Sequence, residues 1–94
     1  MYGSVFKMRP QAGKAGELRD VMMGLTRRPK GMVAAYLLGE DSGGAVWGFA
    51  VFEDEKSYRD NASDPAQGAE YSKFRALLEA DPEWHDGSID QLRM

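Results

Sequence analysis

The sequence predicts an α+β domain in which helices cover one face of a four-stranded antiparallel sheet, and two stretches carry this prediction. Residues 45–54 (AVWGFAVFED) are apolar at every position before Glu53, so a strand here has two apolar faces that both need cover. Residues 32–39 (MVAAYLLG) are also apolar on both faces, and the glycine-rich segment 40–44 has the length of a hairpin loop. We therefore expect these two strands to be antiparallel neighbours in one sheet.

Alternation along the strand at 45–54 divides its side chains between the two faces of the sheet. Ala45, Trp47, Phe49 and Val51 share one face, and Val46, Gly48, Ala50 and Phe52 share the other. The chain's own helices can cover one of these faces, but a chain of 94 residues is too short to provide a second layer. We expect a second copy of the chain to cover the other face, because large exposed apolar patches usually mark interfaces.

Five other segments have the residue pattern of a strand or a helix. In chain order they are a strand at 2–9 ended by Pro10, a helix at 17–26, a short helix at 53–62, a helix at 65–80, and a polar edge strand at 88–94 after a loop at 83–87. The helix at 65–80 begins with an N-cap candidate, Asp64, followed by Pro65 and by Gln67, which could close a capping box. This order of elements is typical of the ferredoxin-like fold.

Composition narrows the class of protein without identifying a reaction. The net charge of -3 argues against a nucleic-acid partner, and the longest apolar run is too short for a membrane span of about 18 residues. The chain has no cysteine, which fits a cytoplasmic location, and its one histidine, His85, excludes a multi-histidine metal site within one subunit. We expect one domain spanning residues 1–94, with neither metal nor cofactor.

Taken together, these patterns resemble the antibiotic-biosynthesis-monooxygenase-like domains of the dimeric α+β barrel superfamily. The resemblance covers nearly the whole chain: YGSVFKMRP followed by GKAGEL, then YLLGEDSGGAVWGFAVFED, EKSYRDNASDP and DPEWHDG. It implies a dimeric α+β barrel, a homodimer formed through the sheet faces, with a cleft between sheet and helices in each subunit. Some members of the family oxidise aromatic polyketides without metal or flavin, by deprotonating a phenolic substrate whose carbanion then reacts with dioxygen.

Another branch of the superfamily degrades haem, and the resemblance to that branch fails at three positions. The branch uses an asparagine on the first strand, a tryptophan on the next-to-last helix and a histidine on the following helix. Here the first strand has no asparagine, the second position falls near Asp60 or Asn61, and the third falls near Glu70 or Tyr71. We therefore expect no haem.

Six residues are candidates for the cleft, each with a structural alternative. Aromatic residues at Tyr36, Trp47 and Phe49 could line an apolar pocket, or could instead be core or dimer-interface residues. Polar anchors could come from Asn61 and Tyr71, which otherwise would be a helix-end residue and a core ring.

The sixth candidate is His85, in the loop expected at 83–87. Its neighbour Asp86 could orient the imidazole as a base, provided that the two side chains face each other. Otherwise Trp84 would anchor the loop and His85 would be exposed. The segment 27–31 (RRPKG) also has two interpretations. Its three positive charges could bind an anion, or the segment could be a solvated turn.

The sequence leaves three functions open. One is cofactor-free oxidation of a small aromatic molecule. Another is a non-catalytic dimeric domain that binds a small apolar ligand or assists another enzyme. The last is a purely structural or ancillary dimer whose clefts are filled by side chains.

Overall fold

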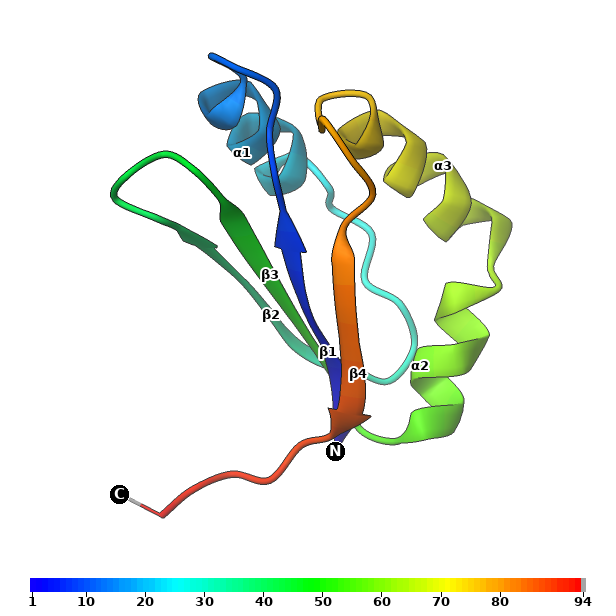
Figure 1. Ribbon diagram of the computed structural model, residues 1–94. Helices are drawn as coiled ribbons and strands as arrows, with labels where there is room; N and C mark the ends of the chain where they lie inside the picture. Colours follow the sequence, from blue (N-terminus) through cyan, green and yellow to red (C-terminus); the bar gives the residue numbers. More distant parts are fainter. Residues whose placement is uncertain (94) are drawn as a thin grey trace.

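The computed structural model describes residues 1–93, and Figure 1 shows its course from the N-terminus to the C-terminus. Seven elements follow one another: β1 (Tyr2–Met8), α1 (Ala15–Met23), β2 (Met32–Gly39), β3 (Val46–Phe52), α2 (Glu55–Ala62), α3 (Pro65–Arg75) and β4 (Glu83–Ser88). The last residue of the predicted strand at 88–94, Met94, lies outside the described part.

The four strands form one antiparallel sheet in the order β2-β3-β1-β4, with β1 paired to both β3 and β4. All three helices lie on the same side of this sheet (Figure 1). The α+β, ferredoxin-like fold predicted from the order of elements is therefore confirmed. Within residues 1–93 no helix is long and apolar enough to cross a membrane.

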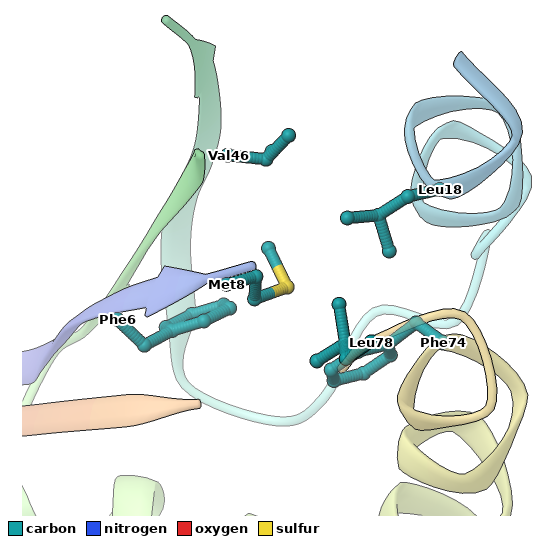
Figure 2. Close-up of a cluster of buried hydrophobic side chains, with 6 residues drawn as sticks. All are labelled: Phe6, Met8, Leu18, Val46, Phe74 and Leu78. Carbon is teal, nitrogen blue, oxygen red and sulfur yellow. The ribbon is translucent and has the colours of Figure 1, made fainter. Parts of the chain in front are cut away.

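The register assigns each face of the central strands. Met8 pairs with Val46 and Phe6 pairs with Gly48, so these positions share one face, and Met8, Phe6 and Val46 belong to the buried core. The core also includes Leu18 of α1, Phe74 of α3, and Leu78 in the turn after α3 (Figure 2). Since the core lies between sheet and helices, the helix-covered face of β3 carries Val46, Gly48, Ala50 and Phe52.

No helix within residues 1–93 covers the opposite face of the sheet. Val5, Tyr36 and Leu38 lie on this face by register, and Tyr36 and Leu38 are 62% and 59% exposed. Trp47 and Phe49 lie on the same face between them. We call this surface, formed by Val5, Tyr36, Leu38, Trp47 and Phe49, the open sheet face.

The prediction of a loop at 83–87 followed by a strand at 88–94 was wrong. The last strand is Glu83–Ser88, paired with β1 from Lys7 opposite Glu83 to Tyr2 opposite Ser88. Its sequence lacks the apolar alternation by which a strand is usually recognised, because an edge strand with exposed side chains needs few apolar positions.

The predicted end of the long helix near residue 80 was also too late, since α3 ends at Arg75. The chain leaves the helix because it pairs with the segment after β1: the main-chain N–H of Gln11 donates to Leu77, and that of Glu79 donates to Arg9. Long-range pairing here overrides the helical pattern of the sequence.

The start of α3 follows the predicted cap in part. The Asp64 carboxylate accepts a hydrogen bond from the N–H of Ala66 at 2.8 Å, and Pro65 occupies the first helical position. The capping box does not form, since the side chain of Gln67 points to Arg27 instead.

Candidate functional site

A cavity of about 630 Å³ lies between the helix-covered face of the sheet, the helices α2 and α3, and the segment that joins α1 to β2. Its volume lies within the range of about 300–1,000 Å³ that is typical of small-molecule sites. Three of its walls carry the side chains that matter for binding: the β1–β4 pair, the helix pair α2–α3, and the segment 25–29.

Aromatic rings line the wall formed by β1 and β4. Phe6 and Trp84 stack with ring centroids 4.6 Å apart, and Tyr71 of α3 approaches Trp84 at 6.3 Å. Trp84 is 43% exposed although it contacts the core ring of Phe6, so its outer face remains open to the cavity. Such a surface favours stacking of a flat ring system.

Next to Trp84 along the same wall, Tyr58 and Asp86 form a polar pair. The Tyr58 hydroxyl donates to Asp86 Oδ1 at 2.9 Å. Burial, followed by this hydrogen bond to a carboxylate, raises the pKa of Tyr58 to about 12. Arg59 lies behind the pair, with Nη1 3.8 Å from Asp86 Oδ2. The phenol therefore stays protonated at neutral pH and holds the carboxylate in place.

Ser4 lies on this wall, 2% exposed, and among the described residues its hydroxyl has no hydrogen-bond partner of good geometry. Its cross-strand neighbours explain this: Ala50 has no polar side chain, and Asp86 is bound by Tyr58. The hydroxyl lies near enough to Tyr58 to act against the rise in the pKa of that phenol, yet it forms no aligned hydrogen bond. A buried hydroxyl in this state is unfavourable for the fold.

Replacing Ser4 by alanine is expected to raise the free energy of unfolding by about 1 kcal/mol, because an unsatisfied buried hydroxyl costs roughly 1–3 kcal/mol. Urea unfolding of the wild type and of Ser4→Ala measures this difference. Ser42→Ala is the control, since Ser42 is exposed and accepts a hydrogen bond from Gly44 in the hairpin loop. A loss of stability in Ser4→Ala greater than in the control would contradict the assignment of Ser4 as unsatisfied.

Polar side chains of the helix pair meet Arg27 at the opposite wall, and we call these four residues the Arg27 network. Arg27 Nε donates to Glu70 Oε1, and Nη2 donates to Asn61 Oδ1 at 2.9 Å and to Gln67 Oε1 at 3.0 Å. Asn61 Nδ2 also donates to Gln67 Oε1, at 3.2 Å. The Arg27 side chain is 29% exposed and that of Glu70 is 16% exposed. This network ties the segment after α1 to both α2 and α3.

The structure brings four of the six sequence-predicted residues to the border of the cavity. Asn61 and Tyr71 line it with their side chains, from α2 and α3. Tyr36 and Phe49 also border it, but the register places their side chains on the open sheet face, so they can reach the cavity only through main-chain atoms.

The other two candidates lie away from the cavity. Trp47 is on the open sheet face, where its Nε1 donates to Glu40 at 2.9 Å and Lys7 Nζ lies 5.3 Å from its ring centroid. His85 pairs with Val5 on the same face, while its neighbours Trp84 and Asp86 turn toward the cavity. Because successive residues of a strand face opposite ways, the suggested imidazole–carboxylate pair does not form.

Sequence reasoning missed Trp84 and Asp86 as cavity residues, because it assigned their segment to a loop. Recognition of a strand at 83–88 would have placed both on one face, two residues apart. The Arg27 network had no comparable signal, because the three hydrogen bonds that Arg27 donates join residues 34 to 43 positions apart in sequence. Across residues 1–93 no group of three or more histidine and acidic side chains is arranged to hold a metal ion.

Comparison with known proteins gives a fold but no sequence family. No protein-family model matches the chain, and no curated protein matches its sequence. Solved structures do match its fold, and three of them illustrate the range of TM-scores and sequence identities.

A Streptomyces coelicolor monooxygenase in complex with nanaomycin D has a TM-score of 0.87 at 19% identity, covering 99% of this chain and 90% of that one. SnoaB, a cofactor-independent oxygenase from Streptomyces nogalater, has a TM-score of 0.82 at 21% identity, with 97% and 94% covered. A structure described as an antibiotic biosynthesis monooxygenase has a TM-score of 0.78 at 10% identity, with 97% and 100% covered. The chain thus has the fold of these monooxygenase structures, as the sequence resemblance predicted.

Proposed function

We propose that this chain is a monooxygenase-like domain that binds a small aromatic molecule in the cavity and oxidises it without a cofactor. The observation that carries the proposal is the cavity itself, where the rings of Phe6, Trp84 and Tyr71 are flanked by polar side chains on two walls. A flat ligand can stack on the rings while its oxygen substituents meet hydrogen-bonding groups. The fold shared with a cofactor-independent oxygenase supports the same reading.

The chemistry that this proposal requires is modest. A phenolic ligand loses its hydroxyl proton to solvent, the negative charge spreads onto a ring carbon, and that carbon adds dioxygen. Protonation gives a ring hydroperoxide, which loses water to leave a quinone carbonyl, so one oxygen atom enters the ligand and the other leaves as water. The protein's part is to bind the ring, to favour the ionised form and to exclude water from the reacting carbon.

An oxygen electrode with a panel of hydroxyquinone-type phenols tests the proposal. We expect oxygen uptake above the buffer rate with at least one of them, and a loss of most of this uptake in Trp84→Leu, since the stacking surface is removed. Lys14→Ala is the control, because its exposed ion pair with Glu17 lies at the start of α1 and neither residue borders the cavity. Uptake no faster than buffer across the panel would count against an oxygenase.

The alternative is a non-catalytic domain that binds a small apolar ligand. One observation favours it: the single histidine lies on the open sheet face, so no imidazole is available in the cavity as a proton acceptor. This version predicts that an aromatic ligand raises the melting temperature of the protein while oxygen uptake stays at the buffer rate. A screen in which no ligand raises the melting temperature would remove its support.

We further propose that the active form is a homodimer joined through the open sheet faces. Support comes from the exposure of Tyr36 and Leu38 beside Val5, Trp47 and Phe49 on a sheet whose other face is already covered by the chain's own helices. A second copy can match this surface, since two sheets pack face to face about 10 Å apart. The cavity lies on the opposite side, so each protomer keeps its own binding site.

A further inference from the structure

The Arg27 network contains donor groups that the protein itself does not use. Within residues 1–93, Arg27 Nη1 and Gln67 Nε2 form no hydrogen bond, whereas Asn61 Oδ1 and Gln67 Oε1 already accept bonds from the network. The acceptor that remains in the network is the Glu70 carboxylate, whose charge Arg27 offsets. The unused donors Arg27 Nη1 and Gln67 Nε2 therefore suit an acceptor oxygen of a ligand.

The charged residues on this side of the cavity also favour an acceptor oxygen of a ligand. Arg27 and Arg28 both border this side of the cavity, and the Glu70 carboxylate pairs with Arg27. Arg27 also borders a second cavity, whose other charged residues are Lys30, Glu53, Asp54, Lys56, Asp60 and Asp64. The guanidinium and the carboxylate of the Arg27–Glu70 pair are largely shielded from water, so their fields act on a neighbouring group more strongly than those of surface charges. The other titratable side chains that line the cavity are Tyr58, Tyr71 and Asp86.

We propose that Arg27 stabilises the ionised hydroxyl of a ligand bound in the cavity, and that Glu70 limits this effect by offsetting the charge of Arg27. This inference rests on the proposed function, because it assumes a phenolic ligand against the Phe6–Trp84 wall. The hydroxyl proton passes to solvent, and the resulting oxyanion accepts hydrogen bonds from the free donors of the network. Arg27 thereby acts on the ionisation that precedes reaction with dioxygen, and the segment 27–31 serves as an anion-binding segment.

Removing either charge of the Arg27–Glu70 pair should change the pKa of a bound phenol, and the two changes should have opposite directions. Replacing Arg27 by methionine removes the cation, so the pKa of a bound phenol rises. Replacing Glu70 by glutamine removes the opposing anion, so the pKa of the bound phenol falls. Both substitutions remove the same ion pair between Arg27 and Glu70. A merely structural role would therefore move both variants in the same direction.

The probe is 7-hydroxycoumarin, a bicyclic phenol whose neutral and ionised forms have different absorption spectra. A spectrophotometric pH titration of the probe, with protein in excess, gives the pKa of the bound form. Relative to the wild type we expect a rise of about one unit in Arg27→Met and a fall of similar size in Glu70→Gln, which is a tenfold change in the ionisation constant each way. Arg27→Lys keeps the charge and should restore most of the wild-type value.

An exposed ion pair outside the cavity provides the matched controls. Arg75 Nε lies 2.8 Å from Asp81 Oδ1, so Arg75→Met and Asp81→Asn change the same charges elsewhere and should leave the probe's pKa unchanged. Equal values in the wild type, Arg27→Met and Glu70→Gln, or shifts in one direction in both variants, overturn the inference but leave the proposed function standing. Failure of the probe and of the hydroxyquinone panel to bind the wild type overturns both.

Discussion

Replacing Gly3 by alanine is expected to destabilise the protein by about 3 kcal/mol or more, a large part of the roughly 5–15 kcal/mol that stabilises a typical domain. A methyl group at this position would lie 1.9 Å from the main-chain oxygen of Ala50, the residue after Phe49 on β3. A main-chain atom in a paired strand cannot move away cheaply, so the β1–β3 pairing must shift. Urea unfolding measures the loss, and the melting temperature should fall by at least about 12 °C.

The sheet offers a matched control for this substitution. Gly87 lies directly opposite Gly3 in the β1–β4 pairing, and a methyl group there would meet no atom within 4 Å. Gly87→Ala should therefore leave the free energy of unfolding nearly unchanged. Equal stability of the Gly3→Ala and Gly87→Ala variants would show that β1 does not approach β3 as closely as the structure has it.

Aspartate on the open sheet face should separate the protomers. The variants Tyr36→Asp and Leu38→Asp each place a carboxylate on both sides of the proposed interface, where it would be removed from water without a partner. If the two carboxylates together cost about 4 kcal/mol, the dissociation constant of the dimer rises about 10³-fold. Sedimentation velocity over a range of protein concentrations measures this change.

The folded single chain should tolerate these substitutions, because Tyr36 and Leu38 are exposed within it. Met23→Asp is the control, since Met23 is a comparably exposed apolar residue on the helix side of the sheet. We expect it to leave the dissociation constant unchanged. Unaltered sedimentation in all three variants would place the contact between protomers elsewhere, or show that there is none.

The sequence predicted the central hairpin and both faces of β3 because their alternation needs no knowledge of the rest of the chain. It could not decide which face the helices cover, since both faces are apolar. The choice depends on long-range fit: Phe6 of β1 lies against Gly48, where a methyl group would come within 2.1 Å of the Phe6 ring. The glycine makes room for a core ring, and this fit appears only when β1 and β3 are paired.

The candidate site was harder to predict than the fold for the same reason. The strand Glu83–Ser88 carries charges at two of its six positions, and pairing with β1 is what makes it a strand. Its two side chains that face the cavity, Trp84 and Asp86, were therefore not predicted as cavity residues. His85 was proposed for the cleft only because Asp86 is its neighbour in the sequence. Asn61 and Tyr71 were proposed as polar anchors of an aromatic pocket, and the structure places both beside the cavity.

The central claim is that one face of the sheet borders the ligand cavity and the other contacts a second copy of the chain. Sedimentation equilibrium of the unmodified protein at micromolar concentration tests this claim most directly. A sheet with an uncovered apolar face should associate, so we predict a species of twice the 10.4 kDa chain mass with a folded circular-dichroism spectrum. A well-folded species of 10.4 kDa alone would contradict it.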